Sequence, residues 1–295
     1  MSPEPAFETV CLVGIGHICS SLALALRRQG LARRLVTFEI DPEARRVAVE
    51  MGLVDLASAD PAEVIPGADL VVVGVPVGAM KSVGQTIAPH LTPGAIVTDT
   101  GSVKQAVVRD LGPSIPAGVH FIPGHPIAGT EFSGPASATE GLFVGRWQIL
   151  TPLPGTDPAA LDRLAALWTA IGSNVEVMEP RHHDRVLAIT SHLPHLIAYT
   201  IVGTASDLEG HLQHEVIKFS ASGFRDFTRI AASDPVMWRD IFLNNREAVL
   251  EVIQRFTEDL TALQRAIRWG EGEILQQKFT ETRAIRRAII DARQA

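Results

Sequence analysis

Two polar loops hold the residues best suited to acid–base chemistry. Asp99 to Lys104 follows one apolar stretch, and Gly124 to Glu131 follows the next. His125 lies in the second loop, and an imidazole with an ordinary pKa of about 6.5 can accept a proton near neutral pH. Ser102, in the first loop, can orient His125 or a substrate hydroxyl. A structural histidine bonded to backbone is the alternative for His125, but its loop position favours catalysis.

Arg225 and Arg229 form a second pair with chemical potential. They are four residues apart in a helical pattern, so we expect them on one helix face. Two guanidinium groups there suit one or two carboxylates, because each planar group can donate two parallel hydrogen bonds. An exposed charged face with Asp226 as the partner is the alternative, and the spacing alone favours it.

A glycine-rich turn predicts a dinucleotide site. Gly14 and Gly16 follow an apolar strand and open a helix, an arrangement that brings backbone N–H groups to a pyrophosphate. Glu39 ends the second strand, where an acidic residue holds the ribose hydroxyls of NAD and repels the 2′-phosphate of NADP. A solvated strand end is the alternative for Glu39. The expected cofactor contacts are Gly14, Ile15, Gly16, His17, Ile18, Glu39, Val75, Pro76, Thr100 and Gly101.

The elements that position these residues divide the chain into two halves. Residues 1–178 alternate helical patterns with short apolar runs, which predicts βαβ units and a parallel sheet. The runs are residues 10–13, 35–39, 70–75, 95–99, 120–122, 148–151 and 175–178. Residues 179–295 have helical patterns throughout. We therefore predict a dinucleotide-binding domain over residues 1–178 and a helical domain over residues 179–295.

Three features stand out in the helical half. Residues 185–204 are apolar almost all round, which predicts a buried helix that Pro194 kinks or breaks. Asp234 can cap a helix that begins at Pro235. Further on, apolar residues recur in a heptad-like seam that serves either packing within the domain or a subunit interface. The seam comprises Phe242, Val249, Ile253, Phe256, Leu260, Leu263 and Ile267.

Composition narrows the class of protein. The 295 residues carry a formal net charge of −7, which disfavours binding to nucleic acid. The best apolar run, residues 70–77, has the length of a strand, and the N-terminus shows no signal region, so we expect no membrane span. Two cysteines, Cys11 and Cys19, make no disulfide framework, so we expect a cytoplasmic protein. The histidines lack zincin spacing, and we expect no metal site.

The combined motifs resemble the prephenate and arogenate (cyclohexadienyl) dehydrogenases of tyrosine biosynthesis. The resemblance rests on the two polar loops and on residues 182–184, 191–195, 223–229 and 233–240. It implies an α/β protein with an N-terminal Rossmann dinucleotide-binding domain and an all-helical C-terminal dimerisation domain. It also implies a homodimer, favours a subunit interface for the apolar seam, and places the active site where the two domains meet.

The resemblance also assigns roles in oxidative decarboxylation. It implies that His125 accepts the substrate's hydroxyl proton and that Ser102 helps to hold His125 and the hydroxyl. Arg229 matches the residue that binds the ring carboxylate, with Arg225 helping. The other residues expected on the substrate side are His183, His192, His195, Thr130, Glu131 and Trp238. Glu131 can pair with Arg229, and for Trp238 packing is an equal alternative.

Cys19 and His17 depart from the family's glycine-rich turn, because Cys19 stands where the third glycine belongs. We expect this larger side chain to push the helix from the strand, so that Cys19→Gly keeps or tightens NAD affinity. Two other functions stay open. One is a dehydrogenase of a β-hydroxy or imino acid, which depends on a lysine in the helical domain. The other is a degenerate nucleotide-binding protein without turnover.

Overall fold

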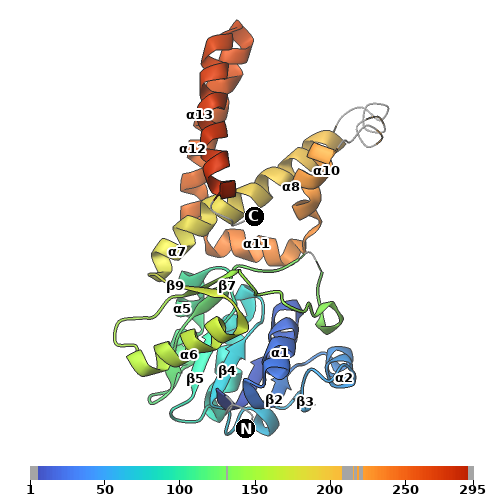
Figure 1. Cartoon of the computed structure of the whole chain (residues 1–295), viewed down its shortest axis with the longest axis vertical. Coiled ribbons are helices and arrows are strands. Elements are labelled where there is room, and N and C mark those ends of the chain that lie inside the picture. The colour runs from blue at the N-terminus through green and yellow to red at the C-terminus, as the bar shows by residue number, and fades with distance from the viewer. Residues whose placement is uncertain (1–5, 131, 208–214, 216–217, 219–221, 292–295) are drawn as a thin grey trace. The chain divides into compact units, whose positions relative to one another are not determined.

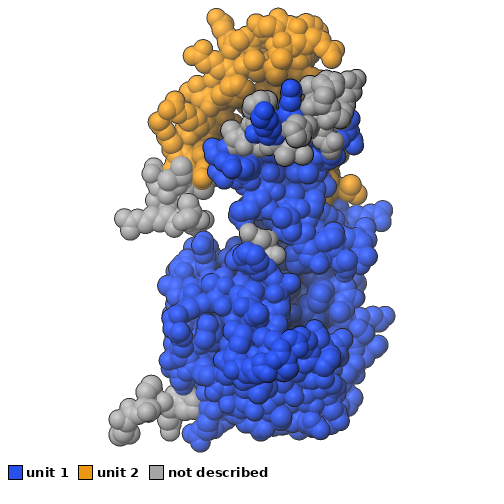
Figure 2. All heavy atoms as spheres, turned by 90° about the vertical axis from the view of Figure 1, so that its right-hand side faces the viewer, with its two compact units in different colours: residues 1–246 blue, residues 247–295 orange. Residues whose placement is uncertain are grey.

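The computed structural model describes residues 6–130, 132–207, 215, 218 and 222–291. The chain forms two compact units, residues 1–246 and 247–295, coloured separately in Figure 2.

A six-stranded parallel sheet forms the centre of the nucleotide-binding part (Figure 1). Its strands are β1 (Phe7–Val13), β2 (Ala32–Phe38), β3 (Leu56–Ser58), β4 (Leu70–Val73), β5 (Ile96–Asp99) and β6 (His120–Phe121). Their order is β3-β2-β1-β4-β5-β6, and every pair is parallel. The predicted α/β fold is confirmed. The order reverses between β1 and β4, and ligands of such sheets bind outside the carboxyl ends of the strands at that point.

Alternate residues of the central strands enter two separate cores. Val10 and Leu12 of β1 pack on the face that α1 (His17–Gln29) and α6 (Pro158–Ile171) cover. Cys11 and Val13 pack on the opposite face with residues of α4 (Met80–Ile87) and α5 (Lys104–Asp110). Because successive side chains of a strand point to opposite faces, a sheet covered on both sides needs continuous apolar strands. Two further helices, α2 (Pro42–Glu50) and α3 (Pro61–Val64), connect the outer strands.

The last three strands form a sheet of their own, which the sequence patterns did not separate from the first. It comprises β7 (Gly124–Pro126), β8 (Trp147–Leu150) and β9 (Asn174–Val177). β7 pairs with β8 in antiparallel fashion, with His125 opposite Ile149, whereas β8 and β9 are parallel. This second sheet places His125 on a strand rather than in a loop.

Beyond β9 the described residues form helices, as predicted. They are α7 (Pro180–Leu187), a π-helical turn (Ala188–His192), α8 (Leu193–Ser206), α10 (Ser222–Thr228), a 3₁₀ turn (Arg229–Ala232) and α11 (Pro235–Asn244). Asp234 caps α11 by accepting a hydrogen bond from the Met237 N–H at 2.7 Å, and Pro235 is the first helical residue, both as predicted. The domain boundary predicted after residue 178 falls between β9 and α7.

The helix around Pro194 agrees with its prediction in one respect and differs in another. Regular α-helix is interrupted before Pro194: α7 ends at Leu187, and a wide π-helical turn leads into the first turn of α8, where a proline is tolerated. The helix is not buried, however: Ile189 is 59% exposed and Val202 is 40% exposed. The expected burial was wrong because an apolar composition does not say whether this chain or another molecule covers the helix.

The stretch Pro180–Ser206 is long and apolar enough to cross a membrane when only length and composition are considered. Within its apolar window 22% is buried. No other described helix meets that criterion. The prediction that no apolar run reaches membrane length holds for runs without polar residues. It does not hold for this helix, whose mean hydropathy is high although it contains polar residues.

The second unit contains α12 (Arg246–Trp269) and α13 (Gly272–Asp291), joined by a turn at Gly270, whose φ is +68°. The predicted apolar seam does not lie on one helix, because Phe242 belongs to α11 and α12 begins four residues later. Along α12, Leu260 is 53% exposed and Ile267 is 67% exposed. The C-terminal part of the seam is therefore exposed and available for contact with a partner.

Candidate active site

A buried ion pair holds the strand that carries His125. Lys104 is fully buried, and its ammonium group donates hydrogen bonds to Asp99 Oδ2 and to the Gly124 carbonyl, each at 2.5 Å. The Gly124 N–H in turn donates to Asp99 Oδ1 at 3.1 Å. Burial lowers the pKa of Lys104, and the Asp99 carboxylate counters that effect. Hydrogen bonds from the end of β5 therefore hold Gly124, the residue immediately before His125, in place.

Only glycine fits at position 124. A Cβ there would stand 2.7 Å from Gln148 Nε2 and 3.2 Å from the Asp99 carbonyl oxygen. The close approach of β7 to β5 therefore requires the glycine that precedes His125 in the sequence.

His125 belongs to a chain of three hydrogen-bonded side chains. Its Nδ1 lies 2.8 Å from His183 Nε2, and His183 Nδ1 lies 2.8 Å from Asp184 Oδ1. His183 and Asp184, both in α7, are completely buried. Burial lowers the pKa of His125 well below 6.5, and His183, Lys104 and His192 lower it further. Burial also lowers the pKa of His183, while Asp184 raises it. Both imidazoles are therefore neutral near pH 7.

Asp184 connects three parts of this unit. Its two carboxylate oxygens accept hydrogen bonds from the backbone N–H groups of Lys104 at 2.7 Å and Gln105 at 2.9 Å, at the start of α5. Its carbonyl oxygen accepts a hydrogen bond from Asn245 Nδ2 at 2.8 Å. The residue that contacts His183 is thereby fixed to the start of α5 and to the end of α11.

His192, His195 and Trp238 form an adjoining cluster. The His195 ring stacks on Trp238 at 3.7 Å between centroids, and His192 meets the same indole edge-on at 6.1 Å. Asn245 Nδ2 donates to His192 Nδ1 at 3.1 Å, and burial lowers the pKa of His192 to about 4. Among the described residues, His192 Nε2 and Trp238 Nε1 are buried without a hydrogen-bond partner. Two buried N–H groups are thus left to donate to a ligand.

The two arginines do not share one α-helix, which corrects the expected spacing. Arg225 lies in α10, which ends at Thr228, and Arg229 begins the 3₁₀ turn that follows. Both are exposed. Burial lowers the pKa of His195, and the positive charge of Arg229 lowers it further, so the guanidinium lies close enough to act on that ring.

The structure shows no contact between the remaining expected substrate residues that it describes, Ser102 and Thr130, and this cluster. Ser102 is partly buried, and the described residues contain no hydrogen bond from it to His125, whose Nδ1 is paired with His183 instead. Thr130 lies beside the glycine-rich turn, with its Oγ1 3.5 Å from His17 Nε2. Glu131 lies outside the described residues.

The glycine-rich turn has the geometry of a nucleotide cradle. Gly14 has a φ of +85°, which favours glycine, and its N–H donates to the Phe38 carbonyl at 2.9 Å. Gly16 caps α1, and a Cβ at Gly16 would meet nothing within 4 Å, so open space lies before the helix N-terminus. Because the first N–H groups of a helix lack partners within it, this opening suits a pyrophosphate.

The acid expected at the ribose stands beside that opening. Glu39 Oε2 accepts a hydrogen bond from the Ile15 N–H at 3.0 Å, and Oε1 accepts one from the Asp41 N–H at 2.9 Å. The other expected cofactor residues follow the carboxyl ends of β4 and β5: Val75, Pro76, Thr100 and Gly101. Ile18 lies on the first turn of α1. The residues present therefore fit NAD.

Position 19 is accommodated differently from our expectation. The Cys19 thiol fills the space beside Gly74, where a Cβ would stand only 2.2 Å from the sulfur. Cys19 packs in the apolar core, and burial raises its pKa to about 12. The helix can approach the sheet because β4 is followed by a glycine. His17 is also accommodated, since its Nδ1 lies 2.9 Å from the Ser137 carbonyl oxygen.

Sequence reasoning missed several contributors to this site. Lys104 and Asp184 lay within motifs that carried the family resemblance, but nothing in their spacing indicated a contact between them or with His125. Asn245 carried no signal at all. Within the described residues no group of three potential metal ligands gathers.

Comparison with known proteins gives the same assignment. The sequence matches the nucleotide-binding domain of prephenate dehydrogenase over residues 22–177 and its dimerization domain over residues 179–281. It is 38% identical over 283 residues to a cyclohexadienyl dehydrogenase of Zymomonas mobilis, covering 96% of each chain. It is 32% identical to a prephenate dehydrogenase of Bacillus subtilis over 92% of this chain and 73% of the relative.

Solved structures agree with the sequence comparison. Prephenate dehydrogenase from Aquifex aeolicus, in complex with hydroxyphenyl propionate and NAD+, superposes with a TM-score of 0.89 at 36% identity, covering 96% of this chain and 98% of the other. Synechocystis arogenate dehydrogenase superposes with a TM-score of 0.77 at 31% identity, covering 93% and 98%. With a nucleotide cradle, a neutral histidine at the sheet edge and these similarities over both halves, the chain belongs to the prephenate dehydrogenase family.

Proposed function

We propose that this NAD-dependent dehydrogenase oxidatively decarboxylates prephenate, arogenate or both, giving 4-hydroxyphenylpyruvate or tyrosine. The observation that carries the proposal is the neutral His125, whose strand β7 is held through Gly124 at the carboxyl end of β5, in the sheet that carries the nucleotide cradle. A base and a hydride acceptor at one sheet edge are what oxidation of a secondary alcohol needs.

The reaction divides between a proton and a hydride. When bound, NAD supplies a nicotinamide ring that accepts the hydride. His125 Nε2 takes the proton of the ring hydroxyl as the carbinol carbon loses its hydride. The resulting ring ketone is a vinylogous β-keto acid, so its carboxylate leaves as carbon dioxide and the ring becomes aromatic. Because aromatisation drives this last step, the protein mainly has to position the substrate.

Positively charged and N–H groups supply that positioning. We assign the ring carboxylate to Arg229, with Arg225 as a second cation for the dianionic substrate. His192 Nε2 and Trp238 Nε1, both buried and without a partner among the described residues, can donate to the side chain of the substrate. We keep Ser102 as a partner of the substrate hydroxyl and place Thr130 near the boundary between cofactor and substrate.

Glu39 selects the cofactor in this proposal. Its carboxylate already stands at the glycine-rich turn, where it can accept hydrogen bonds from the ribose hydroxyls. The same negative charge would repel a 2′-phosphate, so NAD is preferred over NADP.

We also propose a cytoplasmic homodimer built on residues 179–295, with residues 1–178 as the nucleotide-binding domain. The match to a dimerization domain and the exposed apolar residues of α8 support the dimer. The apolar helix Pro180–Ser206 carries His183, Asp184 and His192, which are buried. These polar groups favour a helix of the enzyme over a membrane span. Light scattering of the purified protein tests the proposed homodimer, and a monomer would refute it.

The decisive experiment is to measure NADH or NADPH formation by purified protein, with prephenate and arogenate each crossed with NAD and NADP. Turnover of either substrate supports the proposal, and the ratios of kcat/KM fix the preferences. His125→Asn should abolish turnover and leave NAD binding intact. No turnover of either substrate by folded protein that binds NAD would refute the proposal.

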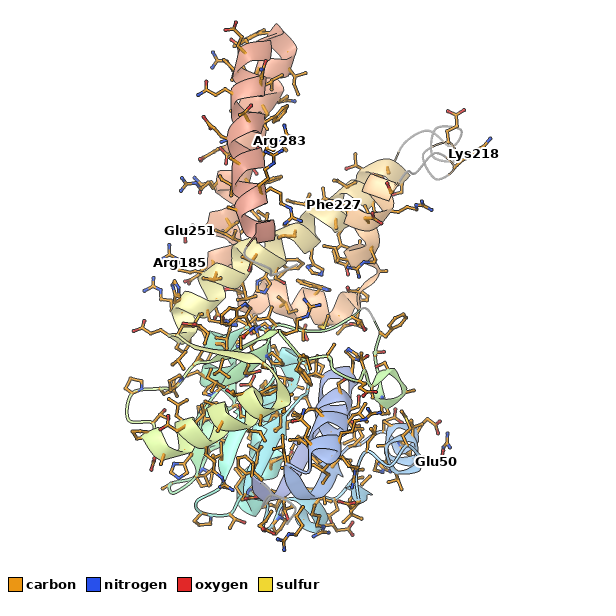
Figure 3. The ribbon with its side chains drawn as sticks, in the orientation of Figure 1. Glu50, Arg185, Lys218, Phe227, Glu251 and Arg283 are labelled. Atoms are coloured by element: carbon orange, nitrogen blue, oxygen red, sulfur yellow. The ribbon has the colours of Figure 1, made fainter. Side chains whose placement is uncertain are left out.

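Two other functions make different predictions. A β-hydroxy-acid dehydrogenase of this fold depends on a lysine near the nicotinamide, but Lys218 lies at the far end of α8 from the sheet (Figure 3). If the chain were a degenerate nucleotide-binding protein, it should bind NAD poorly. The space beside Gly16, where the pyrophosphate would bind, is open, which favours NAD binding.

A further inference from the structure

Two of the histidines that we expected on the substrate side contact each other. His183 was expected to line the substrate side, yet it is completely buried behind His125, with ring centroids 5.1 Å apart. It hydrogen-bonds to His125 on one side and to Asp184 on the other, at 2.8 Å each. Its surroundings give it no open face for a substrate, so its function must pass through His125.

The direction of each hydrogen bond follows from Asp184. Both of its carboxylate oxygens accept from backbone N–H groups of α5, and a carboxylate can only accept. His183 must therefore donate through its Nδ1–H. A neutral imidazole carries one proton, so His183 Nε2 is left with a lone pair. The contact at 2.8 Å is then made by the Nδ1–H of His125 donating to His183.

We propose that Asp184 and His183 are positioning residues that hold His125 in the tautomer whose Nε2 is unprotonated. Resting on the proposed function, this assignment explains how an uncharged histidine is always ready to accept the hydroxyl proton. Nε2 lies on the ring edge opposite Nδ1, away from His183. Without His183, the proton of a neutral His125 can occupy either nitrogen, and the Nε2–H form cannot act as a base.

Burial stabilises the hydrogen bonds that join His125, His183 and Asp184. His183 and Asp184 are 0% exposed, so water cannot replace either hydrogen bond. Lys104 helps to fix the direction of these hydrogen bonds. Its backbone N–H donates to Asp184, and its side chain donates to the carbonyl of Gly124, next to His125. The same α5 N-terminus thus fixes the carboxylate at one end of the chain and the histidine strand at the other.

The test changes His183, because Asp184 also caps α5 and its loss would disturb that helix. His183→Phe keeps a ring but removes both hydrogen bonds. His183→Gln can place its amide oxygen near the position of Nε2, with the amide nitrogen toward Asp184, so it still accepts from His125. His182→Phe, on the exposed neighbouring residue of α7, is the matched control.

The measurements distinguish a positioning role of His183 from a purely structural one. Nitrogen-15 NMR of histidine-labelled protein identifies which ring nitrogen of His125 carries the proton. We expect Nδ1–H in the wild type and a mixture in His183→Phe. For prephenate oxidation, kcat should fall by about 10²-fold in His183→Phe. KM and NAD affinity should stay within about threefold of wild type, the pattern for loss of transition-state stabilisation alone. His183→Gln should recover a large part of kcat, and His182→Phe should match the wild type.

Several outcomes would overturn the proposal. They are an Nε2–H tautomer in the wild type, an unchanged kcat in His183→Phe, and equal losses in His183→Phe and His183→Gln. If His183→Phe does not fold, the wild-type spectrum and His183→Gln still decide. A wild type that oxidises neither prephenate nor arogenate refutes the proposed function, but its spectrum tests the tautomer of His125 independently.

Discussion

Gly74 and Cys19 form a pair whose fit can be tested quantitatively. Replacing Gly74 with alanine would place a Cβ 2.2 Å from the Cys19 sulfur, far inside van der Waals contact. The next nearest atom is the Cys19 Cβ, at 3.5 Å, which is an ordinary contact distance. The clash in Gly74→Ala therefore comes from one sulfur atom, and removing that atom should relieve it.

The magnitudes follow from this geometry. Overpacking a close-packed core costs about 1–3 kcal/mol, and the short distance places Gly74→Ala near the upper end. Cys19→Ala alone removes one buried sulfur and should cost about 1 kcal/mol. The double variant should lie within about 1 kcal/mol of the wild type, since its two methyl groups make an ordinary contact. The expected coupling between the two positions is thus about 3–4 kcal/mol.

Thermal unfolding followed by circular dichroism is the assay. About 2–4 °C of Tm corresponds to 1 kcal/mol in a chain of this size, so Gly74→Ala should lower Tm by about 5–10 °C. Gly203→Ala is the matched control, because a Cβ at Gly203 meets nothing within 4 Å. The reasoning fails if Gly74→Ala is as stable as the wild type, or if Cys19→Ala does not rescue it.

Three predictions concern catalysis. Burial and His183 hold the pKa of His125 well below 6.5, and the neutral imidazole is the active form. The pH profile of kcat/KM should therefore stay level below pH 6.5 and fall only in more acidic buffer; half-maximal activity at or above pH 6.5 would contradict this. Arg229→Lys loses a bidentate contact, so steady-state kinetics should show a KM for prephenate about 10–100-fold higher with NAD affinity unchanged. Glu39→Ser removes a repulsion of about 1–4 kcal/mol and should raise the NADP:NAD ratio of kcat/KM about 10- to 100-fold; an unchanged ratio would exclude Glu39 as the selector.

Local patterns sufficed for most of the fold. Continuous apolar strands such as Leu70–Val73 and the glycine-rich turn predicted the parallel sheet, and Asp234 predicted the start of α11. β3, Leu56–Ser58, was missed because three residues carry no periodicity. The separate second sheet was missed because the pairing of β7 with β8 depends on residues about twenty positions apart, and no turn signal connects them.

The site was predictable only as a set of residues, not as a network. Strand ends and polar motifs drew attention to His125, His183 and the glycine-rich turn. The partner of His125 could not be predicted, because His183 lies 58 positions away and many polar residues lie closer in sequence. Likewise, nothing in the sequence indicated that Gly74, which follows β4, makes room for the Cys19 side chain.

The π-helical turn Ala188–His192 has a consequence for how the length of this region can vary. A π turn holds about one residue more than an α turn, and each residue of a helix corresponds to a rotation of about 100°. Deleting one residue there would restore regular winding and leave α7, with His183, in place. Because the α turn that remains still completes one full rotation, the helix after the deletion would keep its orientation, and His195 would still face Trp238. The loss of one residue should therefore be tolerated in this short segment, whereas a deletion within the regular turns of α8 would rotate all later side chains by about 100°.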